Sequence, residues 1–189
     1  MKTEYDIIQL IKQDEWMMKI IKAVHTLDLP DSWVCAGFIR TKVWDTLHRN
    51  KLRSNLADID VVYFDPDNIS EENEKKYEQI LHGIMPVEPW SVKNQARMHV
   101  INGEEPYTST IDAVSRFPET ATSIAVRFIN DDEIILASPW GIDDLLTMQI
   151  KPTPFFIQKK ELSIIYNERI HRKKWKDKWP MAEIHCLYP

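Results

Sequence analysis

Two aspartates separated by a single residue, Asp58 and Asp60, are the side chains in this sequence best suited to chemistry. They open residues 58–65, whose β-branched and aromatic side chains predict a strand. Because successive side chains of a strand point to opposite faces, both carboxylates lie on one face and can share a divalent cation such as magnesium. Phosphoryl and nucleotidyl transfer use such a site, since the cation binds phosphate oxygens and offsets charge on the leaving group.

The segment before this pair predicts a place for phosphate. Residues 33–36 form a short apolar strand candidate that runs into Gly37, and a helical pattern follows over residues 41–49. Gly37 would let the backbone approach phosphates, which the helix N-terminus would attract. Arg40 is the better candidate for a cation that steadies a triphosphate, and Lys42 is the second. The alternative is that Asp58 and Asp60 are solvated turn or capping residues and that the cations lie on the surface.

The other predicted elements alternate between helices and strands. A strand is predicted over residues 92–100, with Lys93, Gln95, Arg97 and His99 on one face. Lys93 and Arg97 would bind the triphosphate if that face borders Asp58 and Asp60; otherwise the face is hydrated. Further elements are one or two helices within 4–27, a helix from Ser70 to about Gly83, a short helix over 110–117, a hairpin of 123–129 and 133–137 with its turn at 130–132, and helices near 142–149 and 159–176. The pattern predicts an α+β fold, a mixed β-sheet flanked by helices.

Composition narrows the class of protein. The chain has 189 residues, with 24 Lys and Arg against 29 Asp and Glu, so overall charge does not indicate a nucleic-acid coat protein. Two cysteines, no signal-peptide pattern and no apolar run of membrane-spanning length predict a cytoplasmic protein with no membrane partner. The basic helix at 159–176 also carries acidic residues, and its cations, Arg169, Arg172 and Lys173 among them, are expected to stay solvated.

Residues 36–45 followed by residues 58–65 resemble a bacterial nucleotidyltransferase-like family of the polymerase-β-like nucleotidyltransferase superfamily. The segments 92–99, 117–122 and 141–145 also look like that family. The resemblance implies a single domain over 1–189, with a catalytic core at 33–155 and a C-terminal covering helix and tail at 156–189. It further implies magnesium-dependent transfer of a nucleoside monophosphate from a nucleoside triphosphate to an acceptor that the sequence does not identify.

Two departures from the superfamily pattern define an alternative. Phe38 follows Gly37 where a second Gly or a Ser is usual, and the strand predicted at 92–100 contains no acid where a third metal-binding carboxylate is expected. Candidates for that carboxylate are Glu88, Asp112 and Glu119, each with an ordinary role in capping or loop solvation. Asp143 and Asp144 are interpreted as helix-capping residues. The alternative function is a catalytically inactive nucleotide-binding or interaction module with the same fold.

Overall fold

The computed structural model describes residues 1–130 and 133–187, so Asp131 and Asp132 of the predicted hairpin turn lie outside the described residues. Five strands form one sheet in the order β3-β2-β1-β4-β5, in which β2 and β3 are parallel and the other neighbours antiparallel. The strands are β1 (Trp33–Cys35), β2 (Ile59–Tyr63), β3 (Trp90–Asn94), β4 (Ala125–Asn130) and β5 (Glu133–Ala137). This mixed sheet with its helices confirms the predicted α+β class.

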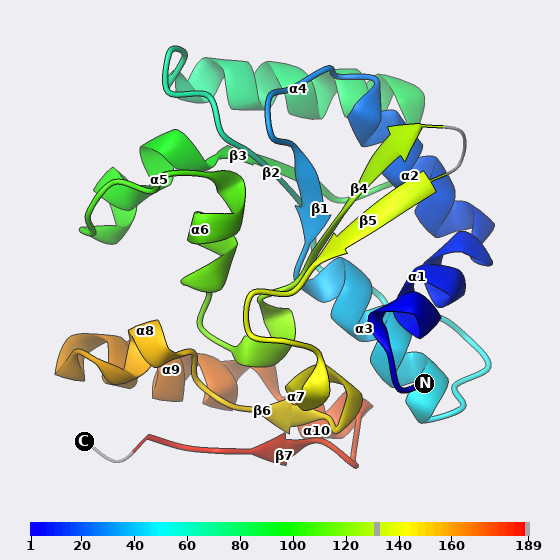
Figure 1. The fold of residues 1–189 in the computed structure, drawn as a ribbon, viewed down its shortest axis with the longest axis vertical. Helices are drawn as coiled ribbons and strands as arrows, with labels where there is room; N and C mark the ends of the chain where they lie inside the picture. The colour runs from blue at the N-terminus through cyan, green and yellow to red at the C-terminus, as the bar shows by residue number, and fades with distance from the viewer. Residues whose placement is uncertain (131–132, 188–189) are drawn as a thin grey trace.

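Helices cover both faces of this sheet and a smaller layer lies beside it (Figure 1). The helices are α1 (Glu4–Lys12), α2 (Glu15–His25), α3 (Gly37–Leu47), α4 (Glu71–Ile84), α5 (Gln95–Asn102), α6 (Thr110–Ser115), α7 (Asp143–Leu146), α8 (Pro154–Ile157), α9 (Lys160–Lys173) and α10 (Trp175–Lys178), with one 3-10 turn, η1 (Thr120–Thr122). Two short parallel strands, β6 (Gln149–Ile150) and β7 (Glu183–Ile184), complete the layer that contains α8, α9 and α10.

The alternation of side chains along the strands divides the core in two. Val34 and Val61 are paired across β1 and β2 and belong to the larger core, which α1 to α4 cover. Cys35 and Val62 point the other way and belong to a smaller core that includes Val114 of α6. Cys35 is the register partner of Asp60. Asp60 therefore lies on the face of the smaller core, as the spacing within β2 requires.

The prediction of one strand over residues 92–100 is wrong beyond Asn94. β3 ends there, and the Asn94 side chain accepts a hydrogen bond from the backbone N–H of Ala96 at 3.1 Å, which caps the start of α5. The helix ends at Gly103 in the left-handed conformation, with φ 67°. A side-chain N-cap and a C-terminal glycine are strong helix signals, and here they prevail over the alternation of polar side chains.

Other boundaries differ less. α3 begins at Gly37, four residues before the predicted helix at 41–49. The helix predicted over 159–176 is broken at Lys174, whose φ of 46° separates α9 from α10. Ser70 caps α4 as predicted, accepting from the N–H of Glu72. Among the described residues, no helix has both the length and the apolar character needed to cross a membrane.

Candidate active site

Asp58, Asp60, Gly37 and Arg40 all line one pocket of about 250 Å³. Asp58 is exposed just before β2, whereas Asp60 is half-buried within it, beside Cys35 of β1 and Ser91 of β3. The pocket forms where β1 ends, β2 begins and α3 starts. Four of the six residues predicted for the site therefore meet, although about twenty residues of chain separate the turn at Gly37 from the aspartates.

The two aspartates carry charge that no protein group neutralises by direct contact. Within the described chain, neither Asp58 nor Asp60 makes a hydrogen bond or ion pair through its carboxylate. Burial, and then the charge of Asp58, raise the pKa of Asp60 to about 6, while the more distant cations Arg169 and Lys173 lower it. Two adjacent carboxylates with free oxygens are a donor set that suits magnesium.

The turn from β1 into α3 brings backbone against this pocket. Ala36 takes the strained conformation with φ 55° and ψ −117°, and α3 then starts without a side-chain cap. A non-glycine residue in such a conformation costs about 1–3 kcal/mol and is typical of functional turns. Gly37 itself is the first helical residue, and a Cβ added there would lie 3.5 Å from Nη2 of Arg40. The uncapped N-terminus leaves N–H groups and positive dipole beside Gly37 in the pocket wall.

Arg40 is a buried cation with unused hydrogen-bonding capacity. Its side chain is stacked near three indole rings, and its Nη2 donates to Oγ1 of Thr41 at 3.1 Å. Its Nε and Nη1 have no hydrogen-bond partner. The pKa of Arg40 is lowered to about 10, chiefly by burial; the charge of Glu119 offsets part of this lowering, and the charge of Arg169 adds to it. A buried guanidinium with two free donors is costly to the protein alone, so it favours an anionic ligand in the pocket.

The C-terminal segment supplies the remaining cations. Arg172 and Lys173 are exposed as expected, whereas Arg169 is partly buried and paired with Glu119, so the expectation of solvation is wrong for Arg169. Arg169 is half-buried, and it lines the pocket together with Arg172 and Lys173 of α9. Lys178 and the rings of Trp175 and Trp179 line it from α10 and beyond. With Arg40, five cations face two carboxylates. The spacing of Arg169, Arg172 and Lys173 on one helical face was the sequence signal for this group, but nothing local indicated which surface that face would meet.

Comparisons with known proteins identify the family and the fold of the chain. A sequence profile described as nucleotidyltransferase matches residues 22–184. The chain belongs to this nucleotidyltransferase family. A solved NMR structure, described as revealing a CCA-adding enzyme head domain, is similar with a TM-score of 0.89 and 32% identity, over 99% of this chain and 98% of that one. No curated protein matches the chain.

The third metal-binding carboxylate that the resemblance led us to expect is not present beside Asp60 on β3. Ser91 occupies the neighbouring position on β3. Glu88 accepts from the indole of Trp16. Asp112 lies in the first turn of α6, which Ser109 caps, and its carboxylate accepts from the N–H of Thr108 and pairs with Arg116. Across residues 1–130 and 133–187, no three His, Cys, Asp or Glu side chains are grouped to hold a metal ion.

Glu119 is the candidate acid whose hydrogen-bond partners line the pocket of Asp58 and Asp60. It is 1% exposed and accepts hydrogen bonds from Nε of Arg169 at 2.6 Å and from Oγ1 of Thr122 at 2.8 Å. Arg169 and Thr122 both line the pocket. Glu119 therefore acts on the site through Arg169, which it orients, and its oxygens are already engaged.

Lys93 and Arg97 are not among the residues that line this pocket. Both bind the fully buried Glu74 of α4: Nζ of Lys93 lies 3.3 Å from Oε2, and Nη2 of Arg97 lies 2.8 Å from the same oxygen. The register places Lys93 on the face of Asp60, but its ammonium reaches round the edge strand to Glu74. Arg97 lies on α5, so the proposed face of Lys93, Gln95, Arg97 and His99 does not form.

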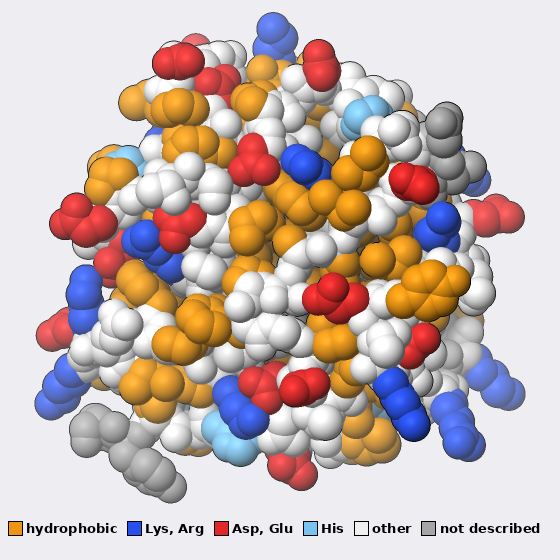
Figure 2. All heavy atoms as spheres, viewed as in Figure 1, with side chains coloured by type: hydrophobic (Ala, Val, Ile, Leu, Met, Phe, Trp, Pro, Cys, Tyr) orange, Lys and Arg blue, Asp and Glu red, His pale blue; other side chains and the backbone are white. Residues whose placement is uncertain are grey.

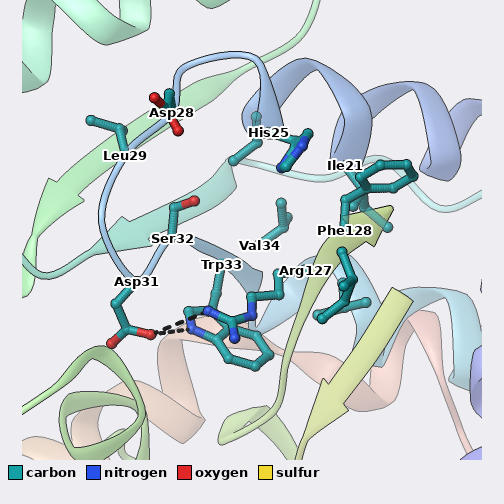
Figure 3. Close-up of a pocket in the computed structure, with 13 residues that line it drawn as sticks. Ile21, His25, Asp28, Leu29, Asp31, Ser32, Trp33, Val34, Arg127 and Phe128 are labelled. Atoms are coloured by element: carbon teal, nitrogen blue, oxygen red, sulfur yellow. Dashed lines mark hydrogen bonds and ion pairs between the residues drawn. The ribbon is translucent and has the colours of Figure 1, made fainter. Parts of the chain in front are cut away.

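A second hollow, of about 280 Å³, lies at the opposite end of β1 (Figure 3). Asp31 is its most enclosed acid, but it accepts from the indole of Trp33 and the N–H of Thr110 and lies 3.7 Å from Arg127. These bonds fasten the loop before β1 to α6 and β4. The acid of this hollow is thus used structurally, which leaves the pocket at Asp58 and Asp60 as the candidate active site of this nucleotidyltransferase.

Proposed function

We propose that this protein transfers a nucleoside monophosphate from a nucleoside triphosphate to an acceptor, with magnesium as cofactor. The observation that carries the proposal is the pairing, in one pocket, of two unpartnered carboxylates with five cations. The carboxylates are the ligands that a magnesium site needs, and the cations supply the positive charge that a triphosphate needs. The family membership supports the reaction class, and the acceptor is left open.

Each group has a role that follows from its chemistry. Asp58 and Asp60 hold magnesium, which when bound supplies positive charge to phosphate oxygens and fixes their position. Arg40 supplies a positive charge at the pocket wall, and its Nε and Nη1 are buried donors without a partner that a phosphate oxygen can satisfy once the side chains around them shift. Lys173 adds charge at the pocket mouth, and the uncapped start of α3 adds N–H donors.

The catalytically inactive module is the less favoured function. A protein that had lost metal chemistry would be expected to neutralise its carboxylates with a nearby lysine or arginine, yet Asp58 and Asp60 form no ion pair with described side chains. One observation favours the inactive module: no acid lies beside Asp60 on β3. Two carboxylates with bound waters are nevertheless sufficient for one magnesium ion, because that ion usually keeps several waters.

Asp58→Asn and Asp60→Asn test the proposal. Each change is nearly isosteric, so folding should persist while magnesium-dependent binding of nucleoside triphosphates, measured by calorimetry, falls at least about tenfold. Asp67→Asn is the matched control, because Asp67 is exposed and its carboxylate has no partner in the described structure. Unchanged binding in both site variants would defeat the assignment. Triphosphate binding without pyrophosphate release, whatever acceptor pool is added, would support the inactive module instead.

A further inference from the structure

A further cavity, of about 480 Å³, lies between the α5–α6 pair and the α8–α9 pair. We call it the aromatic cavity, because its wall contains the rings of Tyr107, Phe117, Phe155 and Phe156. Hydrophobic side chains also gather on the molecular surface between α5 and α8 (Figure 2). Arg169 and Arg172 line both this cavity and the active-site pocket, so they form a common wall between the two.

The charges of the aromatic cavity are balanced, in contrast to those of the active-site pocket. Arg116 is paired with Asp112, Glu104 with Lys159, and Arg169 with Glu119. The remaining two, Glu168 and Arg172, carry opposite charges. In the neighbouring pocket, the cations that this cavity does not share, Arg40, Lys173 and Lys178, outnumber Asp58 and Asp60, which favours a polyanion. This cavity instead favours an uncharged group with flat apolar faces.

One buried amide gives the aromatic cavity a polar contact. Gln95 is 5% exposed, and its Nε2 donates to the backbone carbonyl of Lys93 at 3.3 Å. That bond fixes the orientation of the amide and leaves Oε1 without a hydrogen-bond donor in the described chain. The guanidinium of Arg116 lies over the rings of Tyr107 and Phe155, and these contacts hold the aromatic wall in place.

The active-site pocket is too small to enclose a whole nucleoside triphosphate, so the nucleoside needs an adjoining binding space. Its volume of about 250 Å³ is below the range of roughly 300–1,000 Å³ typical of sites that enclose a small organic ligand. A triphosphate with its metal would fill it. The nucleoside must therefore extend beyond it, and the aromatic cavity is the adjoining space with the matching chemistry.

We propose that the aromatic cavity binds the nucleobase of the nucleoside triphosphate, with its rings contacting the base and Oε1 of Gln95 accepting a hydrogen bond from a base N–H. This inference rests on the proposed function, because the triphosphate must lie in the active-site pocket. With the base bound in this cavity, Gln95 and the aromatic wall determine which nucleobase the protein prefers. Arg169 and Arg172, between the two spaces, then border the sugar and the α-phosphate.

Two adjacent isoleucines of α9 allow a matched test. Ile165 lines the aromatic cavity and is 51% exposed, whereas Ile164 is 45% exposed and does not line it. Both can therefore be enlarged to tryptophan without disturbing the core. Calorimetry would measure the binding of ATP, CTP, GTP and UTP, and of inorganic tripolyphosphate as a probe without a nucleoside, all with magnesium. Wild-type protein should bind at least one nucleotide more tightly than tripolyphosphate, by about tenfold, as expected for one stacked base.

Ile165→Trp should remove that difference and leave tripolyphosphate binding unchanged, while Ile164→Trp should alter neither. If all four nucleotides bind wild-type protein no more tightly than tripolyphosphate, the inference is overturned and the proposed function stands. The same holds if Ile165→Trp binds nucleotides as wild type does, which would assign the cavity to another ligand. If neither nucleotide nor tripolyphosphate binds with magnesium, the proposed function itself fails and the inference fails with it.

Discussion

The guanidinium of Arg40 lies 4.6 Å from the centre of the Trp179 ring, so the start of α3 and the C-terminal segment meet inside the candidate active-site pocket. Trp179 makes a second contact with α3, because its Nε1 donates a hydrogen bond to Oδ1 of Asp45 in that helix at 2.8 Å. The C-terminal segment is consequently part of the pocket and packs against Arg40, the cation for which phosphate binding is proposed. This arrangement leads to predictions that separate folding from ligand binding.

Arg40→Met should weaken binding of magnesium–nucleoside triphosphate by about tenfold to a hundredfold, because a charge-assisted hydrogen bond to phosphate contributes about 1.5–3 kcal/mol. The free energy of unfolding should stay within about 1 kcal/mol of wild type, since the lost ring contact is offset by removal of a buried, under-bonded charge. Calorimetric titration and urea unfolding measure the two quantities. Arg53→Met is the control: Arg53 also lies over an indole, that of Trp16, but outside the pocket. Equal losses of affinity in both variants would contradict the assignment of Arg40.

Gly37→Ala should reduce triphosphate affinity while leaving the melting temperature unchanged or slightly raised. Gly37 is helical, so alanine is tolerated there, but its methyl group would lie beside Nη2 of Arg40 on the pocket wall. Gly83→Ala in α4 is a matched control, because a Cβ there meets nothing within 4 Å. Wild-type affinity in Gly37→Ala would show that phosphate does not approach this turn.

Glu119→Gln should lower the free energy of unfolding by about 1–3 kcal/mol, because Arg169 and Thr122 lose the charged acceptor they share. Magnesium-dependent nucleotide binding should persist, in contrast to Asp60→Asn. The two variants would be compared by chemical unfolding and by titration with magnesium and nucleotide. A loss of magnesium dependence as large as that of Asp60→Asn would instead identify Glu119 as the missing metal ligand.

Asp45 should make folding sensitive to acid. Burial alone raises its pKa, but hydrogen bonds from the backbone and hydroxyl of Ser54, from Trp179 and from Asn50 outweigh burial and lower the pKa below the ordinary value. A carboxyl with a lowered folded-state pKa stabilises the fold above its unfolded pKa of about 3.9, and that stability is lost as the pH falls through the folded-state pKa.

Asp45→Asn should therefore cost about 1–3 kcal/mol near neutral pH, and its difference from wild type should shrink below about pH 4. Urea unfolding at several pH values measures this difference, and Asp67→Asn again serves as the exposed control. A difference between Asp45→Asn and wild type that stays constant down to the lowest pH would show that the charge of Asp45 contributes nothing.

The sequence by itself determined the features that depend on short-range geometry. The predicted strand alternation placed Asp58 and Asp60 on one side, and both line one pocket although Asp58 lies one residue before β2. The apolar run before Gly37 located the turn into α3. Ser70 marked the start of α4, because a hydroxyl at that position satisfies a free backbone N–H. These signals lie within a few residues of the structure they specify, so no knowledge of packing was needed.

Tertiary structure decided which distant groups complete the site. Arg169, Lys173 and Trp179 reach the pocket from more than a hundred residues beyond Asp58, and helical spacing states only that the cations of α9 share a face. Packing likewise committed Lys93 and Arg97 to Glu74, because a fully buried carboxylate must be paired or pay a large desolvation cost. Contacts between remote segments decide which surface a helix covers and which buried charge pairs with a nearby cation. Such contacts leave no periodic signal in the chain.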